Sequence, residues 1–286
     1  MNTLHALLIA PFGSLAFFRA AFVACLALAV ANGVIGTLLV LRRMSLEGDV
    51  LSHAVMPGAA IGFLYGGPSP GWLSLGGAAS GLAVAMLAGI VARGRTRDEA
   101  GLVAFYLVAL SAGVLLVSWR GSNVEVVRVL FGTVLAIDRD ALYRIVAAAS
   151  VILVVTAALY RPFAVGSFDP DFLRAVAGRM PYRGIFVALV VLALVSSFQA
   201  FGTLLAMGPL LLPAAAAQCW RLGVAAAMAL AIALGTLASA AGLLVSYHAN
   251  LPSGPAIVLA GGCLFAASLA ASGAVRRQQL IRRAAG

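Results

Sequence analysis

The sequence predicts an all-α membrane protein, a polytopic bundle of about eight or nine transmembrane helices. Of its 286 residues, 63% are hydrophobic and only 10% are charged, and the mean hydropathy is +1.07. Soluble domains are roughly half apolar and a quarter charged, so a chain of this composition has too little polar surface to stay dispersed in water. Apolar stretches of about 20 residues, the length of a membrane-spanning helix, recur along the chain. These observations exclude an aqueous enzyme.

Charged residues and Gly/Pro clusters separate the apolar stretches and define the element order. We expect spans at 15–41, 45–66, 71–92, 100–118, 141–160, 184–200, 202–220, 222–247 and 255–274. Residues 1–14 precede this transmembrane domain of 15–274, and 275–286 form a cytoplasmic tail. Residues 119–140 mix Val-rich alternation with charges, which indicates a partly inserted periplasmic segment. The sixth and seventh stretches join almost without a loop, so we expect one of them to be short, broken or re-entrant.

The basic residues indicate the orientation in the membrane. All nineteen are arginine, and the chain has no lysine. They cluster at the ends of apolar stretches, so the positive-inside rule explains the net charge of +10 better than a nucleic-acid-binding surface does. An amino terminus outside and a carboxyl terminus inside place fourteen of the nineteen in the cytoplasm. This asymmetry predicts an odd number of spans, and we expect no nucleic acid as a partner.

Several enzyme motifs are absent from the sequence. A phosphate-binding loop of the GxxxxGK[ST] type needs a lysine, so this chain does not hydrolyse ATP itself. The HExxH pattern of metalloproteases and the GxSxG pattern of serine hydrolases are also missing. We therefore expect no catalytic residue and no permanently bound cofactor. A channel, a secondary carrier and the membrane subunit of a larger machine remain.

An aspartate and a histidine lie four residues apart in the second apolar stretch. At that spacing, Asp49 and His53 project from one face of a helix, one turn apart. Ionisable residues inside membrane helices are costly, so they usually face a cavity or a partner. A carboxylate with an imidazole suits Zn²⁺, Mn²⁺ or Fe²⁺ better than Ca²⁺ or Mg²⁺. The alternative is structural: Asp49 caps the amino end of the helix, and His53 bonds to it.

The surroundings of this pair extend the hypothesis. Two ligands make an incomplete coordination sphere, so a metal site needs a second copy of the chain or ligands from other helices. Pro57 has no N–H to donate to the carbonyl of His53, so we expect a kink or a carbonyl that orients water beside the imidazole. The other histidines, His5 and His248, are expected to be solvated or interfacial, without a ligand role.

Two further patterns concern helix packing and helix breaks. Pro209 and Pro213 lie four residues apart and cannot bond to the carbonyls of Leu205 and Pro209. They predict a broken or kinked helix that is buried in protein or faces a cavity. Small residues recur at the spacing of closely packed membrane helices, as in Gly58, Gly62 and Gly66, and in Gly77 and Gly81.

The longest arginine-bearing loop contains a short helix with well-marked ends. Asp169 is a good N-cap, Pro170 fits the first helical position, and Asp171 complements the helix dipole. Gly178 then ends the helix. Because it lies between spans, its apolar side chains need a membrane surface or a protein partner, namely Phe172, Leu173 and Val176.

Several separated stretches, in order, are similar to one known family. They are Arg42 to Ser45 running into Gly48 to Ala54, Phe131 to Ala136, Gly202 to Leu205 through Pro213 to Ala217, and Pro252 to Pro255. Nearly end to end, the chain resembles the membrane permease of the ABC-3 family, the zinc, manganese and iron importers. The resemblance implies a multi-pass protein of the bacterial cytoplasmic membrane.

The resemblance also implies roles for these residues and for partners. Asp49 and His53 would line the path of the transported metal, and Pro57, Pro209 and Pro213 would line or kink it. The ligand chemistry mildly favours zinc over manganese or iron, because one histidine per copy in a dimer gives a mixed nitrogen and oxygen set that zinc accepts readily. The partners would be an ATPase subunit, a periplasmic or lipoprotein metal-binding protein and a second permease copy. The helix at 169–178 would be the coupling helix on the ATPase, with contacts from Asp169, Asp171, Phe172, Arg174 and Gly178.

Two rival functions remain at this stage, a secondary carrier and a purely structural membrane scaffold, and the carrier is the main competitor. A proton- or sodium-coupled secondary metal carrier would also use an aspartate inside the membrane. A dependence of uptake on a separate ATPase distinguishes the importer from that carrier.

Overall fold

The computed structural model describes residues 16–67, 69–91, 132, 134–169, 172–173, 181–202 and 205–284, with 108, 111 and 115 as isolated positions. The described residues form helices joined by short turns, which confirms the predicted all-α class. Apart from residues 108, 111 and 115, the predicted span at 100–118 lies outside the described residues, as does most of the segment at 119–140.

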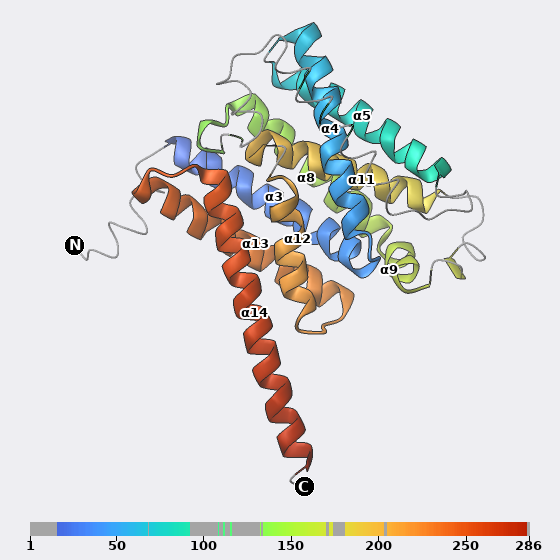
Figure 1. The fold of residues 1–286 in the computed structure, drawn as a ribbon, viewed down its shortest axis with the longest axis vertical. Coiled ribbons are helices and arrows are strands. Elements are labelled where there is room, and N and C mark those ends of the chain that lie inside the picture. The colour runs from blue at the N-terminus through green and yellow to red at the C-terminus, as the bar shows by residue number, and fades with distance from the viewer. Residues whose placement is uncertain are drawn as a thin grey trace.

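The helices follow the predicted order closely (Figure 1). They are α3 (Ala16–Leu41), α4 (Ser45–Gly66), α5 (Pro70–Val91), the short 3₁₀ helix η1 (Val134–Ala136), α8 (Arg139–Ala158), α9 (Tyr160–Phe168), α11 (Tyr182–Phe201), α12 (Met207–Gln218), α13 (Val224–Ala249) and α14 (Ser253–Ala284). Two helices differ from the predicted spans. The helix α9 follows α8 almost at once, and α14 continues as a helix into the predicted tail (Figure 1).

Five of the described helices are long and apolar enough to cross a membrane. They are α3, α8, α11, α13 and residues Ser253–Gly273 of α14. The helix α4 has 22 residues but carries Glu47, Asp49 and His53, which lower its hydropathy. The helix α12 has only 12 residues, about 18 Å at 1.5 Å per residue, and is too short to span a bilayer core. This confirms the expectation that one of the stretches at 184–200 and 202–220 is short.

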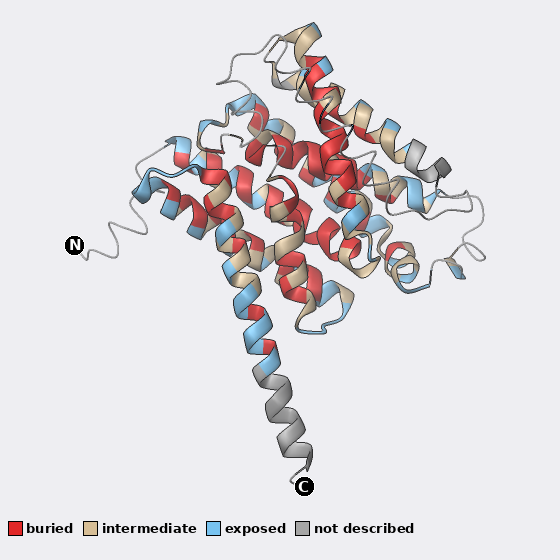
Figure 2. Ribbon diagram, in the orientation of Figure 1, coloured by how far each residue is buried: buried red, intermediate tan, exposed pale blue. Residues whose placement is uncertain are grey.

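The helix α3 forms the centre of the bundle and contacts α8, α11, α12 and α13. Of its apolar window, 72% is buried, compared with 22% for α14, and Figure 2 shows this contrast between the centre and the protruding helix. Large apolar side chains on the outer helices are exposed, such as Val154 of α8 and Leu259 of α14. Such an apolar exterior suits a bilayer, where lipid tails cover it.

Glycines allow α4 and α5 to pack backbone to backbone. An ideal Cβ placed on Gly58 would overlap the carbonyl oxygen of Gly76, and one on Gly62 would overlap the carbonyl oxygen of Trp72. The packing role predicted from the glycine spacing is therefore confirmed for these two positions. The pair of helices stands to one side of α3 (Figure 1).

The turn between α3 and α4 is tight and has defined hydrogen bonds. The N–H of Met44 donates to the carbonyl of Leu39, and the N–H of Arg43 donates to the carbonyl of Val40, each at 3.0 Å. This is a Schellman motif, whose C′ residue adopts the left-handed conformation. Here that residue is Arg43, with φ 56°, where glycine is usual. The motif ends α3 and starts α4 within four residues.

Candidate metal site on helix α4

The predicted metal pair lies well inside a regular helix. The helix α4 begins at Ser45 with Met44 as its N-cap residue, so Asp49 is in the second turn and does not cap it. The Oδ1 atom of Asp49 lies 3.8 Å from Nε2 of His53. That is within ion-pair range but longer than a hydrogen bond of about 3.2 Å. The structural alternative of an Asp49 cap bonded to His53 is therefore wrong.

The two side chains differ in exposure. The His53 side chain is 10% exposed and that of Asp49 is 46% exposed. Among the described residues, no group of three His, Cys, Asp or Glu side chains gathers to hold a metal. The pair thus combines an imidazole at the edge of the core with a carboxylate that is partly exposed.

Neighbouring helices hold α4 on both sides of the pair. The Ser80 hydroxyl of α5 donates to the carbonyl of Ala54 at 2.7 Å, next to His53 in the sequence. On the other side of the pair, an ideal Cβ on Gly48 would lie 2.6 Å from Cε of Met207 and 3.1 Å from Cδ1 of Leu39. Small residues next to Asp49 and near His53 therefore let α3, α5 and α12 position the helix.

Pro57 lies inside α4, one turn after His53, and the helix continues through it to Gly66. Pro209 and Pro213 differ from each other. Pro209 is in the first turn of α12, where its missing N–H costs little, and the Leu205 carbonyl accepts from the N–H of Gly208 at 3.1 Å. The expectation that Pro209 leaves this carbonyl without a donor is therefore wrong. Pro213 lies within the helix.

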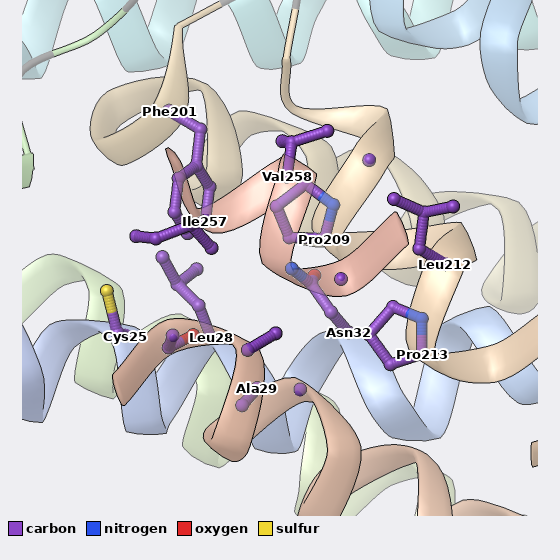
Figure 3. Close-up of a pocket in the computed structure, with 15 residues that line it drawn as sticks. Cys25, Leu28, Ala29, Asn32, Phe201, Pro209, Leu212, Pro213, Ile257 and Val258 are labelled. Atoms are coloured by element: carbon purple, nitrogen blue, oxygen red, sulfur yellow. The ribbon is translucent and has the colours of Figure 1, made fainter. Parts of the chain in front are cut away.

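Both prolines of α12 line a small pocket between α3, α12, α13 and α14 (Figure 3). Its space is about that of one water molecule. Asn32 and Ser239 contribute polar groups to a lining that is otherwise largely apolar. No residue of α4 lines this pocket, so the structure does not bring Pro209 and Pro213 together with Asp49 and His53.

Part of the predicted partner-binding helix is described. The N–H of Phe172 donates to Oδ1 of Asp169 at 2.8 Å, so the predicted N-cap at Asp169 is confirmed. The Phe172 side chain is 54% exposed, and Phe168 just before the cap is 70% exposed. These aromatic groups form an open apolar surface at the end of α9. Three of the predicted contact residues lie outside the described residues, namely Asp171, Arg174 and Gly178.

In the sequence, Arg42 is one of the arginines that indicate topology and the first residue of a family-like stretch, and in the structure it makes specific contacts. Its Nε donates to the Ser167 hydroxyl and its Nη2 donates to the Phe163 carbonyl, both at 3.2 Å. Its guanidinium lies 3.9 Å from the centre of the Phe186 ring. Burial, and then the nearby charge of Arg183, lower the pKa of Arg42 to about 10. The motif Arg-Arg-Met-Ser was the available signal, but it does not tell which arginine is buried.

Of the other two histidines, His248 is exposed in the last turn of α13, with its ring 5.2 Å from that of Tyr247. His5 lies outside the described residues. The described cysteines, Cys25, Cys219 and Cys263, are free thiols.

Comparisons with known proteins agree with this architecture. The model of the ABC 3 transport family matches residues 14–272. A relative from Listeria monocytogenes, the manganese transport system membrane protein MntC, is 31% identical over 251 residues, covering 87% of this chain and 88% of the relative. The manganese import system permease protein ScaB of Streptococcus parasanguinis is 30% identical over 251 residues, with the same coverage.

A solved structure has the same fold. It is PsaBC from Streptococcus pneumoniae in complex with Fab, with a TM-score of 0.81 and 27% sequence identity over 91% of this chain and 94% of the matched chain. Both relatives are named as manganese transport proteins, so their names do not support the preference for zinc that was drawn from the sequence. Because the family model matches nearly its whole length, the chain belongs to the ABC 3 transport family. It is a membrane permease without an ATPase site of its own.

Proposed function

We propose that this chain is the permease subunit of an ATP-driven importer in the bacterial cytoplasmic membrane, and that its cargo is a divalent transition metal, with manganese first among the candidates. The observation that supports this most directly is the Asp49 and His53 pair on α4. Family membership supports the importer over the secondary carrier, and the names of the two bacterial relatives support manganese.

The chemistry of the pair fits a cargo that binds briefly. One carboxylate oxygen and one imidazole nitrogen are ligands that manganese, iron and zinc all accept. Two such ligands hold a metal weakly, and conduction requires an ion to leave as readily as it enters. A second copy of the chain would double the set to two oxygens and two nitrogens. We therefore propose a homodimer in which both α4 helices face the metal path.

The proposed assembly places partners on the two sides of the membrane. A periplasmic or lipid-anchored metal-binding protein delivers the ion outside, and an ATPase subunit binds inside, at the helix that starts with Asp169. The transmembrane domain covers 15–274, with the amino terminus outside and the carboxyl terminus inside. A reporter fused after Gly286 tests this orientation, and a periplasmic signal would contradict it.

Radioactive manganese uptake by cells that express the whole transporter tests the proposed site. We expect Asp49→Ala and His53→Ala each to reduce uptake to background while the permease still inserts and binds its ATPase. His248→Ala is the matched control for a histidine, since His248 is exposed on α13, and Asp140→Ala is the control for an exposed aspartate at a helix start. Wild-type uptake by both α4 variants would refute the proposed site.

The same assay identifies the cargo and separates the two transport classes. Competition by unlabelled manganese, zinc and iron ranks the metals, and zinc as the strongest competitor would overturn the choice of manganese. Uptake that persists without the ATPase subunit, driven by an ion gradient, would favour the secondary carrier instead.

A further inference from the structure

A partly buried arginine joins two parts of the chain that the proposed function uses separately. Arg42 belongs to the turn that ends α3 and starts α4, while its hydrogen-bond acceptors, the Phe163 carbonyl and the Ser167 hydroxyl, belong to α9. Its guanidinium also stacks over Phe186 of α11. We call these four residues, Arg42, Phe163, Ser167 and Phe186, the Arg42 clamp. The rings of Phe163 and Phe186 pack edge to face, with centroids 5.8 Å apart.

On one side, the clamp lies close to the segment that is proposed to bind the ATPase, because Ser167 is only two positions before Asp169. The chain leaves α9 at Phe168, and Asp169 caps the next helical turn. Leu173 of that turn packs back on α9. An ideal Cβ on Gly166 would lie 2.6 Å from Cδ2 of Leu173 and 3.6 Å from Nη2 of Arg42. The Leu173 side chain and the guanidinium of Arg42 therefore both lie close to Gly166 of α9.

On the other side, the clamp leads directly into the helix that carries the metal pair. Arg42 and Ser45, the first residue of α4, are only three positions apart in the chain. In the first turn of α4, Glu47 forms an ion pair of 3.9 Å with Arg183 of α11, and Asp49 follows two residues later. The start of α4 is thus linked to α9 through Arg42 and to α11 through Glu47.

An arginine suits this position for a physical reason. Its planar guanidinium can donate in its plane to two acceptors while its face stacks on an aromatic ring, and a lysine ammonium does not reproduce that geometry. Removing this cation from water also has a cost. Arg43, the exposed neighbour, already supplies a positive charge for the topology. A charge for topology alone does not need the contacts that Arg42 makes.

We infer that Arg42 is a positioning residue that couples movement of the segment carrying Asp169, Phe172 and Leu173 to α4, and so to Asp49 and His53. This inference rests on the proposed function. When the ATPase moves the segment, α9 moves with it, and the two hydrogen bonds of Arg42 carry that displacement to the α3–α4 turn. A weaker clamp lets the segment move without α4, and ATP hydrolysis then proceeds without metal transfer.

The test measures the amount of manganese moved per ATP hydrolysed. Wild type, Arg42→Lys, Ser167→Ala and the control Arg43→Lys are each reconstituted with the ATPase subunit and the metal-binding protein in liposomes. We expect Arg42→Lys to lower the ratio of metal to ATP about tenfold, the effect of one charge-assisted hydrogen bond on an equilibrium. ATPase activity should stay near that of wild type. Ser167→Ala, which removes one acceptor, should lower the ratio less, and Arg43→Lys should not change it.

The ratio distinguishes coupling from a merely structural role. A structural anchor would lower assembly, ATPase activity and uptake in parallel and leave the ratio unchanged, and that result would overturn the inference. A normal ratio in both Arg42→Lys and Ser167→Ala would also overturn it. If Arg42→Lys fails to assemble, the ratio of Ser167→Ala against Arg43→Lys decides. Absence of ATP-dependent manganese uptake by the wild type is a separate outcome, which would refute the proposed function.

Discussion

The close packing of α4 on α5 predicts a large effect from adding a single methyl group. An ideal Cβ on Gly58 would overlap the Gly76 carbonyl oxygen, and it would also lie 2.5 Å from Cβ of Ser80. Because one of these atoms belongs to the backbone of α5, rotation of a side chain does not relieve the overlap. In Gly58→Ala the two helices must separate, and the hydrogen bond from Ser80 to the Ala54 carbonyl, 2.7 Å long, is strained or lost.

The magnitude follows from three contributions. Overpacking a tight interface costs about 1 to 3 kcal/mol, and losing an interhelical hydrogen bond in a membrane costs about 0.6 kcal/mol. Replacing a helical glycine by alanine stabilises the helix by about 1 kcal/mol. The expected net loss is therefore about 0.6 to 2.6 kcal/mol of unfolding free energy. Gly262→Ala is the matched control, since a Cβ on Gly262 meets no atom within 4 Å, and that variant should gain about 1 kcal/mol.

Reversible unfolding in mixed micelles, followed by helical circular dichroism, measures both variants against wild type. We expect Gly58→Ala to be less stable than Gly262→Ala by about 1.6 to 3.6 kcal/mol. Metal uptake should also fall only in Gly58→Ala, because Ser80 positions α4 next to His53. Equal stabilities for the two alanine variants would refute the reasoning that backbone contact sets the α4–α5 distance.

Three further predictions concern other contacts. Arg43→Gly should raise the unfolding free energy by about 1 kcal/mol, since φ 56° is strained for arginine, and an equal gain in Arg43→Ala would show that strain is not the cause. Asn32 and Ser197 exchange hydrogen bonds of 3.0 and 3.2 Å in the core, so a double-mutant cycle to alanine should give a coupling of about 0.6 to 1.7 kcal/mol, and purely additive losses would contradict this. Asp169→Ala removes an N-cap worth about 1 kcal/mol and should weaken co-purification of the ATPase subunit, whereas unchanged binding would count against a docking role for that turn.

Many of the helices were predictable because each depends on a short range of sequence. A bilayer requires about 20 apolar residues for a span, and the predicted stretches at 15–41 and 45–66 agree with α3 and α4 to within one residue. The pairing of Asp49 with His53 was equally predictable, because an i,i+4 spacing fixes one face of any helix. The cap at Asp169 follows from the same local chemistry.

Other features were not predictable from local patterns. The residues around Pro209 indicated a break, whereas the structure starts α12 just before it, in the turn where a missing N–H costs little. Arg42 and Arg43 carry the same charge, yet Arg42 bonds to α9 and Arg43 is exposed. The sequence also does not indicate that the α12 prolines line a pocket separate from the metal pair.

The linear order of residues was sufficient for the membrane class, most helix ends and the pairing of Asp49 with His53 on one helix face, since backbone geometry and bilayer thickness act over one or two turns at a time. The partners of Arg42 lie more than 120 positions away, and α4 approaches α5 at glycines that no single helix distinguishes from others. These contacts depend on how all the helices fit together, because each helix can settle only where the shapes of its neighbours leave room for it.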